Sequence, residues 1–98
     1  MKKLGKEKDL SVTGYFLPWR PSISFPVIII IEEVEFIAIY STVEKLQKSM
    51  EELKVETYII KQIEGGLEFI KSVQPYRIAL DPWRTENSST RFTEITPR

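Results

Sequence analysis

The chain contains no cysteine and no histidine among its 98 residues. Without cysteine it has no disulfide bonds, thiolate zinc sites, iron–sulfur clusters or cysteine nucleophile. Without histidine it lacks the commonest general base near neutral pH and any serine–histidine relay. We therefore expect no metal, no cofactor and no catalytic residue. A carboxylate or lysine with a shifted pKa stays open as a general base, so an enzyme is not ruled out.

The chain also has no excess of charge, since 14 Lys and Arg residues balance 14 Asp and Glu residues. A neutral chain presents no strong field to nucleic acid or to an anionic membrane. Its longest apolar run, residues 25–31, is far shorter than the about 20 residues of a membrane-spanning helix. No apolar segment of signal-peptide length follows the N-terminus. We therefore predict a soluble, cytoplasmic protein that binds neither nucleic acid nor membrane.

Hydrophobic residues make up 42% of the chain and include five Phe, four Tyr and two Trp. This composition and a length of 98 residues predict one small domain with one core. We expect a flexible basic arm at residues 1–9, a single α+β domain at residues 10–84 and a polar C-terminal segment at residues 85–98. Within the last segment, residues 91–95 favour a short edge strand.

Three β-strands are expected before the first helix. Residues 13–19 alternate weakly and end near prolines, which predicts a short edge strand. Residues 27–40 are too β-branched for a helix. One continuous strand would place Glu33 and Glu35 in an apolar row. We therefore predict a hairpin of residues 27–31 against residues 36–40, joined by a solvated four-residue loop.

The next segment begins with the clearest helix signal of the chain. Ser41 and Glu44 have the spacing of a capping box, in which the serine side chain caps the helix start. Apolar residues then recur at spacings of three and four, as on the buried face of a helix. They are Val43, Leu46, Met50 and Leu53.

The remaining elements complete a β-β-β-α-β-α-β order. Residues 55–60 alternate and predict a strand parallel to its predecessor, residues 61–74 a second helix, and residues 76–80 a short buried strand. This order predicts an α+β fold, with a single mixed sheet of five or six strands and two helices. Helical crossovers between parallel strands are expected to be right-handed.

The segment from Tyr15 to Trp83 resembles the N-terminal domain of the SseB family, named for enhanced serine sensitivity. Four features carry the resemblance: Phe16-Leu17-Pro18, the segment from Phe36 to Thr42, the leucine-bearing helix after it, and Ile78-Ala79-Leu80 followed by Asp81-Pro82. The family more often has Asn-Pro at the last pair. The resemblance implies a fold rather than a reaction.

Both tryptophans lie in the same tripeptide, Pro18-Trp19-Arg20 and Pro82-Trp83-Arg84, each at or just after the end of a predicted strand. Trp and Arg are enriched at binding hot spots, and the preceding proline restricts how each indole is presented. The alternative is that each Trp covers an open end of the small core, with Arg in solvent or stacked on the ring.

These features support two functions. The first is a non-enzymatic interaction or assembly module that forms a homodimer or binds another protein. The alternative is a small anionic-ligand site between the two Pro-Trp-Arg corners, where Arg20, Arg77 or Arg84 holds the anion and Tyr76 or Tyr15 completes the wall. The candidate binding residues are Trp19, Arg20, Tyr76, Arg77, Trp83 and Arg84.

Overall fold

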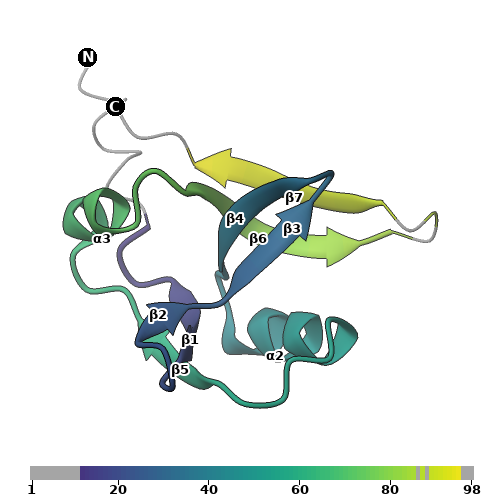
Figure 1. Cartoon of the computed structure of the whole chain (residues 1–98), viewed down its shortest axis with the longest axis horizontal. Helices are drawn as coiled ribbons and strands as arrows, with labels where there is room; N and C mark the ends of the chain where they lie inside the picture. The colour runs from purple at the N-terminus through teal and green to yellow at the C-terminus, as the bar shows by residue number, and fades with distance from the viewer. Residues whose placement is uncertain (1–11, 86, 88, 96–98) are drawn as a thin grey trace.

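A computed structural model describes residues 12–85, 87 and 89–95, so the predicted arm at residues 1–9 lies outside the described residues. The described part contains seven strands and two helices (Figure 1), which confirms the predicted α+β class. In chain order they are β1 (Phe16–Arg20), β2 (Phe25–Pro26), β3 (Ile28–Ile31), β4 (Val34–Ile39), α2 (Val43–Glu52), β5 (Ile59–Gln62), α3 (Gly66–Ser72), β6 (Arg77–Arg84) and β7 (Thr90–Ile95).

The strands form two sheets instead of the single predicted sheet. One has the order β2-β1-β5 and the other β3-β4-β6-β7. The chain passes from the first sheet to the second at Val27, whose N–H donates to the Pro18 carbonyl at 2.9 Å. The two sheets also meet at a bridge between Phe16 and Tyr40. A break of one residue between β2 and β3 leaves the β-branched pattern unchanged, so this division into two sheets was not predictable from the pattern.

Strand β1 lies in the centre of the three-stranded sheet, so the prediction of an edge strand is wrong. It pairs antiparallel with both β2 and β5. Pro18 removes one donor from the strand but keeps its carbonyl, which accepts the hydrogen bond from Val27. A single proline is thus tolerated between two short neighbouring strands, although proline usually indicates an edge.

Strands β3 and β4 form the predicted hairpin, but its loop has two residues instead of four. Ile31 pairs with Val34, and the turn consists of Glu32 and Glu33 with φ values of 52° and 70°. Positive φ at both positions is typical of a type I′ turn, whose usual Asn-Gly signature is missing here. Glu35 pairs with the exposed Ile30, so its carboxylate faces solvent. The hairpin thus keeps this carboxylate out of the apolar row in which one continuous strand would place it.

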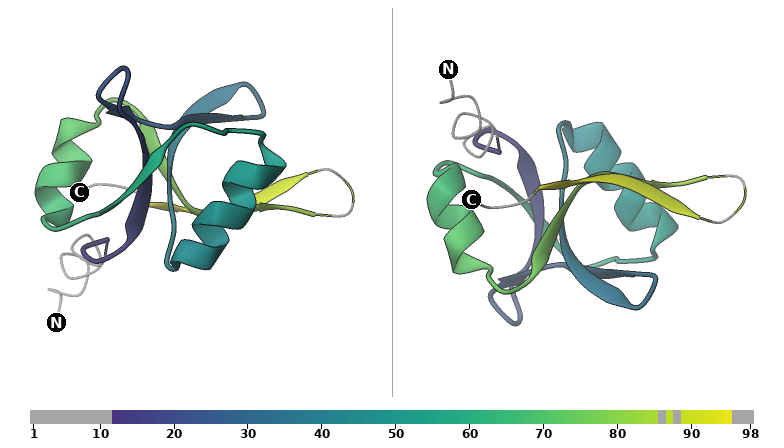
Figure 2. Two further views of the ribbon diagram at one scale, coloured as in Figure 1. Left: turned by 90° about the horizontal axis from the view of Figure 1, so that it is seen from below. Right: turned by 90° about the horizontal axis from the view of Figure 1, so that it is seen from above.

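Strand β4 is buried on both faces and separates two core clusters. Phe36, Ala38 and Tyr40 pack with α2 in one cluster, whereas Ile37 and Ile39 pack with α3 and β1 in the other. Figure 2 shows the two helices on opposite sides of the four-stranded sheet. The apolar run from Phe36 to Ile39 within β4 follows from this double burial.

Helix α2 begins one residue later than predicted. Thr42 is its N-cap, and the Thr42 side chain accepts from the Lys45 N–H at 3.1 Å. The predicted cap, Ser41, instead binds Asp81 of β6. The capping-box spacing was therefore misleading, because a contact 40 positions away competes for the serine hydroxyl.

The helix ends in a Schellman motif, which corrects the predicted strand at residues 55–60. Lys54 has φ of 61°, and the Val55 N–H donates to the Met50 carbonyl at 2.9 Å. In this motif an apolar residue after the cap packs back on the last turn, and Val55 packs on the cluster that contains Met50. The apparent strand pattern thus began with a helix cap.

The strand in this region, β5, starts at Ile59 and is antiparallel to β1, so the predicted parallel pairing is wrong. In the described part of the chain, only β4 and β6 run parallel. Helix α3 is shorter than the predicted helix at residues 61–74. At its start, a Cβ on Gly66 would lie 2.8 Å from Thr13 Oγ1, so glycine allows this close approach.

Replacing the turn residues should stabilise the protein. The substitutions Glu32→Asn and Glu33→Gly together should raise the free energy of unfolding by about 1 to 2 kcal/mol, because both residues have left-handed backbone geometry that Asn and Gly adopt more easily. Urea denaturation measures the change. As a control, Glu35→Asn within β4 should lower stability slightly, since Asn is a poor strand former. A loss of stability in the double variant would contradict the assigned turn.

Candidate functional site

A hollow lined by two predicted binding residues, Trp83 and Arg84, lies at the carboxyl end of β6, beside α2. Its volume is about 450 Å³. Helix α2 contributes Lys45, Lys48, Ser49 and Glu52, and β6 contributes residues 81–84. This volume falls in the usual range of small-molecule sites, and the ends of parallel strands are a common place for them.

A β-bulge in β6 forms the wall of this cavity. Leu80 pairs with Thr93 and Trp83 pairs with Arg91, so Asp81 and Pro82 together oppose one residue of β7. Such a bulge bends the strand and changes the direction of its side chains. The predicted strand at residues 76–80 therefore continues as β6 to Arg84, and Trp83 lies at the cavity with 55% of its surface exposed.

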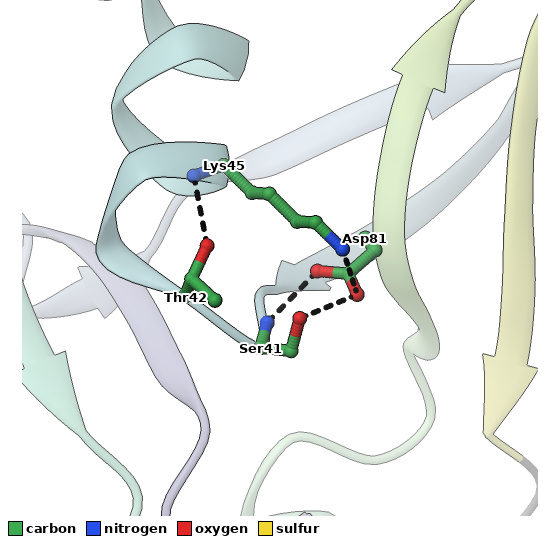
Figure 3. Close-up of polar contacts among 4 residues, drawn as sticks. All are labelled: Ser41, Thr42, Lys45 and Asp81. Atoms are coloured by element: carbon green, nitrogen blue, oxygen red, sulfur yellow. Dashed lines mark hydrogen bonds and ion pairs between the residues drawn. The ribbon is translucent and has the colours of Figure 1, made fainter.

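Asp81 connects the bulge to the start of α2 (Figure 3). It has φ of 51°, a left-handed conformation that Asp tolerates better than most residues. One carboxylate oxygen accepts from the Ser41 N–H and the other from the Ser41 hydroxyl, both at 2.8 Å. The Lys45 ammonium lies 3.5 Å from the same carboxylate. These contacts hold the ends of the two parallel strands together beneath the cavity.

Ser49 lines the cavity and belongs to a buried pair of hydroxyl groups. The Tyr40 hydroxyl donates to Ser49 Oγ at 2.7 Å. Burial raises the pKa of Tyr40 to about 12, so this phenol keeps its proton at neutral pH. Ser49 is only 7% exposed, yet it lines the cavity. Among the described residues no hydrogen bond uses the Ser49 hydroxyl as donor, so its proton is available to a bound group.

A smaller hollow of about 60 Å³ continues from the cavity towards the β3–β4 hairpin. It shares five lining residues with the cavity: Ser49, Glu52, Pro82, Trp83 and Arg84. Its other lining residues are mostly apolar and include residues 29–31 and Leu53. We call the two hollows together the Trp83 groove. The groove has a charged end at Lys48 and an apolar end at Leu53.

Of the two predicted Pro-Trp-Arg corners, only the second lines this groove. Trp83 and Arg84 line both of its hollows. Trp19 lies in β1 of the other sheet, packs on the core cluster of α3 and has the Lys61 ammonium 3.9 Å from its ring centre. Arg20 is exposed at the end of β1. In the part of the chain that the structure describes, Trp19 and Arg20 line neither hollow of the groove.

Tyr76 and Arg77, the other two candidates, have structural contacts away from the groove. The Tyr76 ring packs on Phe25 with ring centres 5.7 Å apart. Arg77 binds Glu94 of β7 through two hydrogen bonds of 2.7 and 2.9 Å. These bonds hold the pKa of Glu94 below its usual range. Arg77 thus joins β6 to β7. Strand β7 includes residues 91–95, for which a short edge strand was predicted.

The contribution of α2 to the groove was not predicted. Lys45, Lys48 and Ser49 were not among the predicted binding residues. A signal was present, since Ser49 lies beside Met50 and three residues after Leu46, within the stripe predicted to be buried. A polar residue in a buried stripe needs a hydrogen-bond partner, and Tyr40 supplies it.

No protein-family model, no curated protein and no solved structure matches the chain. The resemblance to the SseB family therefore stays a prediction. Within the described residues, no helix has the length and apolar character that crossing a membrane requires. In the same part of the chain, no three acidic side chains come together as a metal ion would need.

The contact between Asp81 and Ser41 should appear in a double-mutant cycle. Asp81→Gly keeps the left-handed backbone and should lower the free energy of unfolding by about 2 kcal/mol, because it removes charge-assisted hydrogen bonds. Ser41→Ala should cost about 1 kcal/mol. Urea denaturation of the double variant should show a coupling of about 1 kcal/mol. Lys45→Ala, as a control, should change stability by less than about 0.5 kcal/mol, since Lys45 is exposed. Strict additivity would contradict the assigned contact.

Tyr40 should make the protein less stable at high pH. The pKa of Tyr40 is higher in the folded chain than in the unfolded chain, so its contribution is complete below about pH 10 and is lost as the pH rises towards 12. Between those pH values the wild type should lose about 2 kcal/mol more than Tyr40→Phe, which has no such proton. Denaturation at a series of pH values measures both losses. Parallel stability curves would refute the assignment.

Proposed function

We propose that the protein is a non-enzymatic assembly module that forms a homodimer through the Trp83 groove. The observation that carries the proposal is a cluster of three exposed apolar side chains at one place. Ile30 is 69%, Trp83 55% and Leu53 42% exposed, and all three line the groove. Exposed apolar residues are ordinary when scattered, but a group of them indicates an interaction surface.

The composition of the groove supports this role. Trp83 and Arg84 are adjacent in β6, and both residue types are enriched among interface residues whose truncation weakens binding most. The groove is also built on regular elements, because α2, β3 and β6 supply its walls. A surface on a rigid scaffold loses little conformational entropy on association.

A second copy of the chain is a partner that the charges of the groove allow. The groove contains cations at Lys48 and Arg84 and an anion at Glu52. In a twofold dimer the same surface meets itself, so Glu52 of each copy can face a cation of the other copy. The whole chain has a formal net charge of zero, so no long-range repulsion separates two copies. Cytoplasmic localisation stays a prediction.

Sedimentation velocity over about 1 to 500 µM tests the dimer, a range that covers the affinities expected of a small interface. The wild type should shift towards twice the chain mass of 11.5 kDa as its concentration rises. Trp83→Ser should weaken association at least about thirtyfold, because it removes a central aromatic anchor from both copies.

Ile23→Ser is the matched control. Ile23 is 61% exposed in the turn between β1 and β2, outside the groove, so its replacement should leave the dimer unchanged. A wild type that stays monomeric at every concentration would overturn the proposal. If both substitutions weaken association equally, the dimer contact does not lie at the Trp83 groove.

A further inference from the structure

We propose that the charged end of the Trp83 groove binds a small monocarboxylate that carries an aromatic arm. The carboxylate lies at Ser49, Lys48 and Arg84, and the arm lies along Trp83 towards the apolar end. This inference goes beyond dimer formation and does not depend on it, because one monomer supplies every residue named.

The first support is the free donor in the cavity. Ser49 is buried, lines the cavity and accepts a hydrogen bond from Tyr40 at 2.7 Å. Since Tyr40 is the donor of that bond, the Ser49 hydroxyl can donate its own proton to a group in the cavity. A carboxylate oxygen there would accept it in a charge-assisted hydrogen bond.

The second support is the charge of the cavity. Lys45 and Asp81 already form an ion pair with each other. The other charged residues that line the cavity are Lys48, Arg84 and Glu52, which leave one net positive charge. Within the described part of the chain, Lys48 and Arg84 form no ion pair. A single positive charge matches one carboxylate better than a doubly charged phosphate.

The third support is the position of Trp83 between the two hollows. Trp83 lines both, so a ligand anchored at Ser49 extends past the indole into the part lined by Ile29, Ile31 and Leu53. An aromatic arm gains from stacking on an indole in addition to the burial of its apolar surface. The ligand is therefore expected to have an acid group at one end and a ring at the other.

Fluorescence of Trp83 provides the test. In the Trp19→Phe variant Trp83 is the one remaining tryptophan, and 3-phenylpropionate can be titrated while emission is recorded at a protein concentration at which sedimentation shows a monomer. We expect a saturable change with a dissociation constant of about 1 mM or lower, a strength typical of such a small ligand. Propionate lacks the ring and 3-phenylpropanamide lacks the charge, so each should bind at least about tenfold more weakly.

Two substitutions locate the carboxylate. Ser49→Ala should weaken binding of 3-phenylpropionate about tenfold, because it removes the buried donor. Lys48→Gln changes an exposed residue, so it should fold normally and weaken binding about threefold to tenfold. Lys71→Gln, on α3 and away from the groove, should leave binding unchanged.

The inference is overturned if 3-phenylpropionate gives no saturable change up to about 20 mM, well above the range expected of a specific ligand of this size. It is also overturned if the amide or inorganic phosphate binds as tightly, or if Ser49→Ala and Lys48→Gln both bind as the parent does. Sedimentation without ligand reports on the dimer separately, so a failure of one proposal is distinguishable from a failure of the other.

Discussion

The arrangement of the groove depends on the two hydrogen bonds between the Asp81 carboxylate and Ser41. They join the end of β4 to the end of β6 at the point where the chain enters α2. The bulge that turns Asp81 towards Ser41 also places Trp83 beside the helix. One left-handed residue, Asp81, thus determines the position of both the helix start and the exposed indole. A substitution of Asp81 would therefore alter the cavity even though the apolar side chains that line it stay the same.

The two core clusters explain how so small a chain supports an exposed tryptophan. Strand β4 contributes to both clusters, because alternate residues of its run from Phe36 to Ile39 face opposite sides of the sheet. Each helix then covers one side. With the core supplied in this way, Trp83 is not needed for packing and lies outside both clusters, whereas Trp19 packs on one of them. The same tripeptide therefore has a structural role at one corner and an exposed position at the other.

Local patterns predicted the helices, the hairpin and the α+β class, because periodicity and β-branching act over a few residues. Features set by distant contacts were not predictable. Ser41 lost its expected capping role to Asp81, Val55 resembled a strand residue while closing a helix cap, and a single bend at Val27 divided one sheet into two. For the groove, the sequence indicated Trp83 and Arg84. It did not indicate Ser49, whose importance comes from a tyrosine on a neighbouring strand.

The parallel pairing of β4 with β6 also has a consequence for the order of folding. The β3–β4 hairpin joins residues that are close in sequence, whereas Ser41 and Asp81 are separated by 40 positions. A contact between residues that are far apart in sequence closes a longer loop, so it costs more chain entropy and slows the folding of small domains. The hairpin should therefore form early, and the groove should form late, when β6 docks. A newly made chain would then acquire its core strand before it acquires the surface that we propose for assembly.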